Sequence, residues 1–111
     1  MSNDTNMGNR ILAEFIELPK RNREWDEALT FLYKNYWHLP EKLRFDTDRN
    51  MLHEVWEKFR ELRFDDLQIK SYYDQHKKWI VQAMAYGTLT DLYNALVQAV
   101  KWYNEVTKQK Q

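Results

Sequence analysis

The chain has 111 residues and a mass of 13.7 kDa, which corresponds to one domain. Aromatic residues make up 15% of the chain and hydrophobic residues 43%, a composition that excludes a wholly disordered chain. Lys and Arg total 17, as do Asp and Glu, so no excess charge favours binding to nucleic acid or to an anionic membrane. The absence of Cys excludes disulfides, thiolate metal sites and a cysteine nucleophile.

A single α+β domain is expected to occupy residues 9–107. Residues 1–8 are polar and are expected to form a disordered N-terminus, and residues 108–111 a frayed tail. The N-terminal segment lacks the apolar stretch of a signal peptide, and the longest nearly uncharged stretch, residues 79–90, is too short to cross a bilayer. The sequence therefore predicts a protein that acts in the cytoplasm.

The first predicted element is an amphipathic helix over residues 9–18. Pro19 ends it, because the proline ring clashes with a preceding helical turn. Residues 20–24 are mostly charged and are expected to form a solvated connector. Residues 24–34 fit the apolar stripe of a helix, but their aromatic and β-branched side chains would also suit a strand. We favour a helix for this segment.

A short strand over residues 43–45 is expected to precede the central helix. Asp46 and Asp48 can accept hydrogen bonds from the free N–H groups at the start of a helix, and their charge suits its positive end. The helix itself is predicted over residues 48–62, because its apolar side chains recur with the helical period. This apolar face consists of Met51, Leu52, Val55, Trp56, Phe59 and Leu62.

The last third of the chain is predicted to hold a β-hairpin and a helix. Residues 67–73 alternate between apolar and polar side chains, as strands do, and residues 74–77 suit the turn. The return strand, residues 78–86, is apolar on both faces, which is typical of a strand that is covered on both sides. A long amphipathic helix is expected over residues 89–107.

These elements predict an α+β fold in which three to four helices pack on a small, mainly antiparallel sheet. The strand that is apolar on both faces indicates a sheet between helices, an arrangement like an α/β/α sandwich. The last helix is expected to be capped by Thr88 or by Thr90.

Three segments resemble small proteins carried by phages and mobile elements, in the phage ABA sandwich family. They are residues 11–15 (ILAEF), residues 37–58, which begin WHLPEKLRFDTDRNML, and residues 92–104, which contain LYNALV and KWYN. The chain departs from the family pattern at Arg49, where the family tends to carry Trp. The resemblance implies a sheet between helical layers and a phage or mobile-element origin, and the family has no agreed biochemical function to carry over.

Motifs that would carry catalysis are missing from the sequence. No Gly-x-Ser-x-Gly elbow occurs, and two glycines cannot form a glycine-rich phosphate loop. No pair of histidines has the spacing of a metal site, and His53 lacks a second histidine four residues on. We therefore expect no catalytic residues, no cofactor and no metal site, and read Asp46 and Asp48 as helix caps.

The five tryptophans suggest a non-enzymatic protein that binds a partner protein or a second copy of itself. Tryptophan buries a large area at a low cost in side-chain entropy and is frequent among the residues that dominate protein interfaces. Trp56 lies on a predicted helix core and Trp102 beside another. The remaining three, Trp25, Trp37 and Trp79, are the predicted partner-binding residues.

Two other functions stay open. One is a small-ligand site, for a nucleotide-like molecule, in a pocket between sheet and helix that Arg49, Tyr72 and Tyr86 would line. The other is an accessory protein for nucleic acid, which would use the basic residues within 20–23 and 77–78. The balanced net charge makes nucleic acid the less favoured partner.

Overall fold

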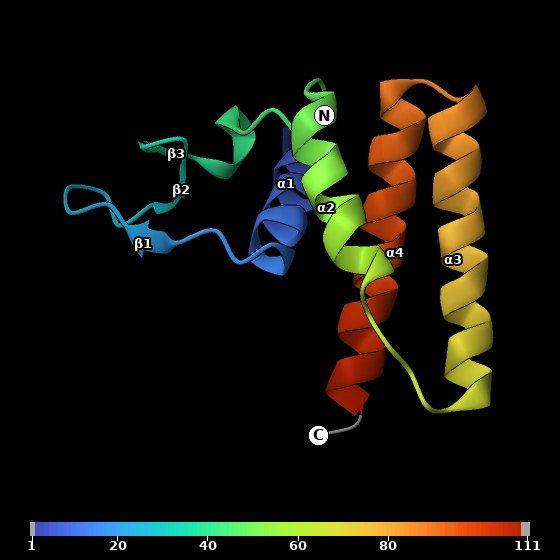
Figure 1. The fold of residues 1–111 in the computed structure, drawn as a ribbon. Helices are drawn as coiled ribbons and strands as arrows, with labels where there is room; N and C mark the ends of the chain where they lie inside the picture. The colour runs from blue at the N-terminus through green and yellow to red at the C-terminus, as the bar shows by residue number, and fades with distance from the viewer. Residues whose placement is uncertain (1, 110–111) are drawn as a thin grey trace.

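The computed structural model describes residues 2–109, and these residues form an α+β fold (Figure 1). Four helices and a three-stranded antiparallel sheet pack together, so the predicted fold class is confirmed. In chain order the elements are α1 (Ser2–Phe15), β1 (Lys20–Asn22), β2 (Leu29–Tyr33), β3 (Tyr36–His38), the short 3-10 helix η1 (Pro40–Lys42), α2 (Arg49–Arg60), α3 (Leu67–Tyr86) and α4 (Leu89–Gln109).

The sheet comes from residues 20–38, which we call the sheet lobe. The prediction of a connector and a helix over residues 20–34 is therefore wrong. β2 is central, and its register pairs Thr30 with Arg21 of β1. Lys34 and Asn35 join β2 to β3, and both have positive φ, 51° and 71°, as a type I′ hairpin turn requires. That turn forces the flanking aromatic residues into paired strands.

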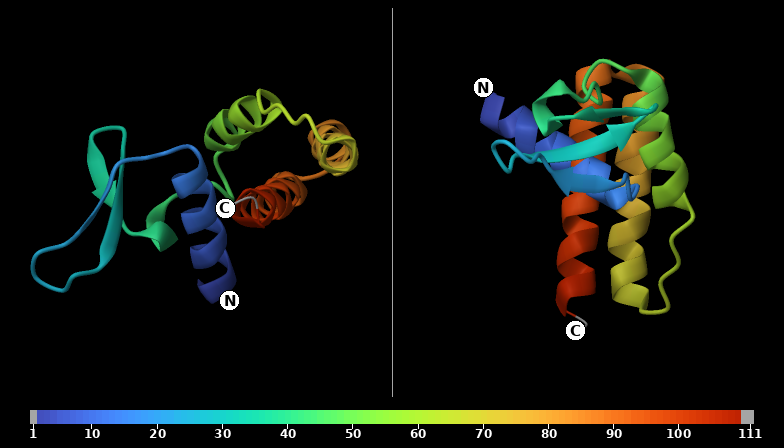
Figure 2. Two further views of the ribbon diagram at one scale, coloured as in Figure 1. Left: turned by 90° about the horizontal axis from the view of Figure 1, so that it is seen from below. Right: turned by 90° about the vertical axis from the view of Figure 1, so that its left-hand side faces the viewer.

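The helices of residues 2–109 lie to one side of the sheet lobe, with α1 next to it (Figure 2). The sandwich arrangement that the sequence and the family resemblance implied, with helical layers on both faces of the sheet, is not what this chain adopts. The sheet joins the helical core through Phe31, whose side chain is fully buried. The outer face of the lobe is left for solvent.

Helix α1 begins earlier than expected. Residues 2–8 are helical rather than disordered, and only Met1 of the predicted disordered terminus lies outside the described residues. Gly8 lies in this early part of the helix, and a Cβ there would collide with the hydroxyl group of Tyr93. The absence of a side chain lets α1 approach α4 closely, and α1 is held there by the buried side chain of Asn9.

Helix α2 matches its prediction. The carboxylate of Asp48 accepts hydrogen bonds from the backbone N–H groups of Asn50 and Met51, as a cap should. The predicted apolar face is buried from Met51 to Phe59. The strand expected over residues 43–45 does not form. These residues follow η1 without regular structure and enter a turn at Phe45, and the side chains of Leu43 and Phe45 are buried in the core.

Residues 67–86 form one continuous helix, α3, so the predicted β-hairpin is wrong. The carboxylate of Asp66 caps its first turn. Tyr73 and Ile80, seven residues apart, are buried and mark the inner face. The segment looked like a strand because the outer face of α3 also carries large apolar side chains, which hide the helical period.

Helix α4 runs antiparallel to α3 and carries much of the core. Thr88 caps it: the Thr88 hydroxyl accepts from the backbone N–H of Asp91, and the Asp91 carboxylate accepts from the N–H of Thr88. Residues 108–109 belong to this helix, while residues 110–111 of the expected tail lie outside the described residues. Within residues 2–109, no helix is long and apolar enough to span a membrane.

Candidate functional site

The three predicted anchor tryptophans are all solvent-exposed, but they lie on two different surfaces. Trp25 is 78% exposed at the tip of the β1–β2 connection, and Trp37 is 36% exposed on β3. Trp79 is 50% exposed on α3, which is at the far side of the molecule from the sheet lobe (Figure 1). The structure therefore brings Trp25 and Trp37 together and separates Trp79 from them.

Two arginines accompany the tryptophans of the sheet lobe. The guanidinium carbon of Arg21 lies 4.1 Å from the ring centroid of Trp37, and that of Arg23 lies 4.9 Å from the ring centroid of Trp25. Both distances are within the range of cation–π attraction. We call these four residues, Arg21, Arg23, Trp25 and Trp37, the Trp–Arg surface. They border one groove of about 450 Å³, whose floor includes Thr30.

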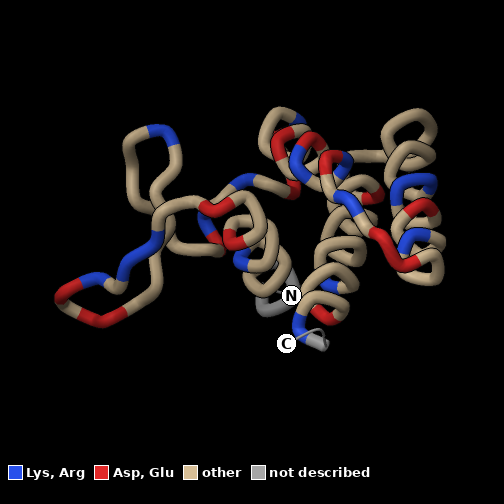
Figure 3. Tube along the Cα trace, turned by 60° about the horizontal axis from the view of Figure 1, so that its bottom comes forward, with Lys and Arg blue, Asp and Glu red and all other residues tan. Residues whose placement is uncertain are grey.

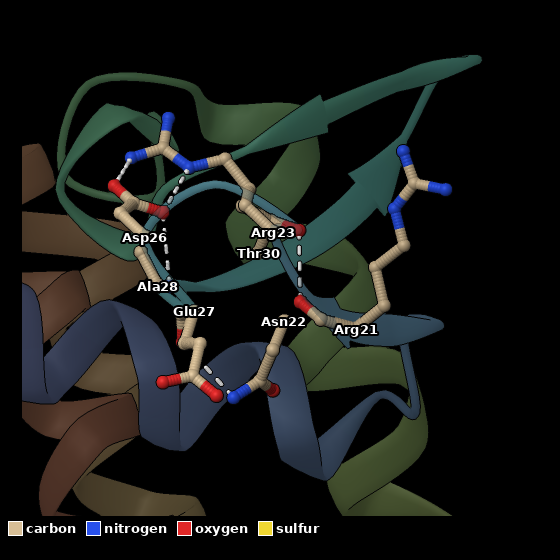
Figure 4. A network of polar contacts seen from close by, with 7 residues as sticks. All are labelled: Arg21, Asn22, Arg23, Asp26, Glu27, Ala28 and Thr30. Atoms are coloured by element: carbon tan, nitrogen blue, oxygen red, sulfur yellow. Dashed lines mark hydrogen bonds and ion pairs between the residues drawn. The ribbon is translucent and has the colours of Figure 1, made fainter.

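A hydrogen-bond network fixes the loop that carries Trp25 (Figure 4). The guanidinium of Arg23 donates two hydrogen bonds to the carboxylate of Asp26, which also accepts from the backbone N–H of Ala28. The side-chain amide of Asn22 donates to the carbonyl of Glu27 at 3.0 Å, and Glu27 takes a positive φ of 58°. The exposed indole is thus mounted on an ordered loop.

The charge of Asp26 is part of this network. The hydrogen bond from Arg23, aided by the backbone N–H of Ala28, lowers the pKa of the Asp26 carboxyl below its ordinary value. The carboxylate therefore stays ionised to a lower pH than a free aspartate would. The Arg23–Asp26 pair is exposed, so we treat it as a geometric restraint on the loop rather than a source of stability.

Arg21 differs from Arg23 because, among the described residues, it forms no ion pair. Its side chain points away from the Arg23–Asp26 pair (Figure 4). The backbone carbonyl of Arg21 accepts a hydrogen bond from the hydroxyl of Thr30 at 3.0 Å, which secures the strand beneath it. The guanidinium N–H groups above Trp37 are free to receive an anionic group from another molecule.

The residues predicted to line a small-ligand pocket do not surround one cavity. Arg49 is exposed at the start of α2, whereas Tyr72 and Tyr86 both lie on α3, ~21 Å apart along its axis. Tyr72 alone borders a groove, of about 480 Å³, between α3 and α4. Tyr86 ends α3 and is 90% exposed. This separation leaves the nucleotide-like ligand without the convergent groups that its recognition would need.

The two basic segments also lie apart, at opposite ends of the molecule (Figure 3). Lys20 of the first segment pairs with Glu14, and Arg23 with Asp26. In the second segment Lys77 pairs with Asp74 within α3. Acidic partners therefore neutralise most of these cations, and they form no continuous path for a phosphate backbone.

Comparisons with protein families, curated proteins and solved structures find no match to this chain. The resemblance to the phage ABA sandwich family stays a prediction. Across the part of the chain that the structure describes, no group of three or more His, Asp or Glu side chains is placed to hold a metal ion. A function therefore has to be inferred from the residues of the Trp–Arg surface.

The sequence did not predict that Arg21 would belong to the Trp–Arg surface. The cluster forms only when β1 pairs with β2 and β2 with β3, and these strands were not predicted. One local signal was available, since Arg21 and Arg23 are two residues apart and would share one face of an extended strand. This spacing is informative only if residues 20–23 are known to be extended, and the sequence did not predict a strand there.

Proposed function

We propose that this chain is a non-enzymatic binding protein that holds a partner protein through the Trp–Arg surface. The observation that carries the proposal is the 78% exposure of Trp25 on a loop held by hydrogen bonds from Arg23 and Asn22. A large indole exposed to water is unfavourable in a free protein, and its burial in an interface would recover that free energy.

The loop that carries Trp25 is held by hydrogen bonds, and this supports a binding role for the exposed indole. A side chain that is already fixed loses little conformational entropy when a partner covers it, so more of the contact energy appears as affinity. Trp and Arg are the residue types most often found to dominate interfaces, and here two of each lie within one surface. The surface thus has the composition and the preorganisation of an interface centre.

The free guanidinium of Arg21 indicates the chemistry of the partner. A carboxylate is the planar group that best matches the paired N–H donors of arginine. We therefore propose a partner that presents an Asp or Glu beside an apolar side chain that covers the indoles. The family resemblance adds a phage or mobile-element origin to this proposal, with the host cytoplasm as the place of action.

The test compares proteins captured from host cytoplasm by the wild-type chain and by three variants. Trp25→Ala and Arg21→Ala should each lower the amount of the specific partner at least tenfold, because each removes a central contact. Tyr36→Ala is the matched control. Tyr36 is an aromatic residue of β3 that is 71% exposed, close to the 78% of Trp25, and it is adjacent to Trp37 in sequence and so lies on the other face of the strand.

Circular dichroism and urea unfolding should show that all three variants fold as well as the wild type, because the replaced side chains lie at the surface. Capture of the same proteins in the same amounts by the wild type and by Trp25→Ala would contradict the proposal. The proposal would also be contradicted if Tyr36→Ala lowered the amount of captured partner as much as Trp25→Ala does.

A further inference from the structure

Helix α3 carries a second exposed aromatic surface, far from the sheet lobe. Tyr72, Trp79 and Tyr86 follow one another at intervals of seven residues, so they lie in one line along the helix. Their side chains are 54%, 50% and 90% exposed. The line is ~21 Å long and parallels the helix axis. We call these three residues the aromatic stripe.

The face of α3 beside the aromatic stripe carries no charged side chain. Gln68, Gln75 and Gln82 recur at the same interval of seven and lie beside it. α3 contains four charged residues, and each lies at least about 100° around the helix from Trp79. These are Lys70, Asp74, Lys77 and Lys78. In a chain with 31% charged residues, a face of α3 that carries no charge over ~21 Å has the composition of an interface centre.

The aromatic stripe is symmetric about its middle residue. Tyr72 and Tyr86 stand seven residues before and after Trp79, so reversing the direction of the helix superimposes the pattern on itself. An interface that obeys a two-fold axis needs this self-complementarity. We propose that two copies of the chain associate through antiparallel α3 helices, with Trp79 at the two-fold axis and Tyr72 beside Tyr86 of the other copy.

A groove lies where this arrangement would place the second copy's Tyr86. Its volume is about 480 Å³, and its walls combine apolar with polar and acidic side chains: Ile69, Tyr72, Trp102 and Val106, with Gln68, Asp66 and Glu105. Tyr86 is almost fully exposed and projects from the last turn of α3. The two-fold operation brings it to the level of Tyr72, so each copy supplies one projecting ring and one groove.

The available area suits a dimer. The exposed parts of the three rings amount to on the order of 400 Å² per copy, since a buried aromatic side chain covers 150–250 Å². A standard interface takes roughly 800 Å² from each partner. The glutamines and the groove walls are placed to supply the remainder.

The proposal is independent of the proposed function, because the Trp–Arg surface lies on the opposite side of the molecule. The test measures the mass of the full chain in solution by sedimentation equilibrium, at micromolar to millimolar concentrations. The wild type should approach twice its monomer mass of 13.7 kDa. A wild type that stays monomeric over this range would overturn the proposal.

Tyr86→Glu tests the site, because it replaces the projecting ring by a carboxylate, which the Asp66 and Glu105 carboxylates of the groove would repel, and it leaves the core untouched. The dimer dissociation constant should rise at least tenfold. Val81→Glu is the matched control, since Val81 is also exposed on α3 but lies about 160° around the helix from Trp79. Equal dissociation constants for the two variants would show that any dimer uses another surface.

Cross-linking tests the antiparallel direction, because the natural chain has no Cys and an engineered one is unique. In the proposed dimer, position 75 of one copy faces positions 82–83 of the other. A mixture of Gln75→Cys and Gln82→Cys chains should therefore give mostly mixed dimers with a short bismaleimide reagent. Mostly self-linked Gln75→Cys dimers would indicate parallel helices and overturn the arrangement.

Discussion

The side chain of Asn9 ties three distant segments together. It is fully buried, and its amide nitrogen donates to the carbonyl of Pro40 at 2.8 Å and to that of Leu43 at 3.0 Å. Its amide oxygen accepts from the hydroxyl of Tyr93 at 3.1 Å. Every polar atom of the side chain is thus used, which a buried amide requires. The segment that follows the sheet lobe is fastened to α1 by this residue.

We predict that Asn9→Asp lowers the free energy of unfolding by about 3 kcal/mol. Aspartate keeps the shape of the side chain but cannot donate to the two carbonyls, and it buries a charge. Urea unfolding measures the change. Asn94→Asp, on the exposed face of α4, is the control and should change the free energy by less than about 0.5 kcal/mol. A similar loss in both variants would contradict the role given to Asn9.

Single residues such as Asn9 could not be assigned from the sequence. An asparagine at the edge of a helix stripe looks like a surface residue, and its three partners are 31, 34 and 84 positions away. Two of the caps, Asp48 and Thr88, could be predicted, because these residues act on N–H groups within three residues of themselves. Local hydrogen bonds leave a sequence signal, and distant ones do not.

At the scale of elements, predictions succeeded where one face of a helix is apolar and the other polar. α2 and α4 have this pattern, and their predicted ranges agree with the structure to within two residues. The helix α3 was not predicted, because both of its faces carry large apolar side chains and the helical period is hidden. Short apolar runs do not distinguish a strand from a helix, and the same ambiguity affected residues 24–34. The Trp–Arg surface could not be predicted for the same reason, since its arginines and tryptophans come together only when the strands pair.

We predict that Gln75→Pro lowers the free energy of unfolding by about 3 kcal/mol or more. Gln75 lies in the middle of α3, where proline removes a backbone donor and clashes with the preceding turn. Gln75→Ala, which keeps the helix, should be neutral or slightly stabilising. Thermal or urea unfolding of both variants makes the comparison. If residues 74–77 formed a hairpin turn instead, the proline would be tolerated.

At the scale of the whole molecule, Tyr93 lies where α1 and α4 meet and is nearly buried. Burial, with a smaller contribution from the charge of Asp46, raises the pKa of Tyr93 to about 12 from its ordinary 10. The folded state thus favours the neutral phenol. Its contribution to stability is fully present below pH 10 and is lost as the pH rises from there towards 12.

We predict that the free energy of unfolding falls by about 2 kcal/mol more in the wild type than in Tyr93→Phe between pH 10 and 12, because each pKa unit corresponds to about 1.4 kcal/mol. Urea unfolding at several pH values measures this. Tyr36→Phe, at an exposed site, should follow the wild type. Identical pH profiles for the wild type and Tyr93→Phe would contradict the assignment.

The hydrogen bond between Asn9 and Tyr93 also constrains how the chain can be made. Its two residues are 84 positions apart, so α1 leaves the ribosome long before α4 is synthesised. The sheet lobe pairs strands that are neighbours in sequence and can form early. The segment around η1 can cover part of α1 early, whereas the side of α1 that faces α4 stays uncovered until α4 is made. The contact between α1 and α4 can therefore form only after residue 93 has been synthesised.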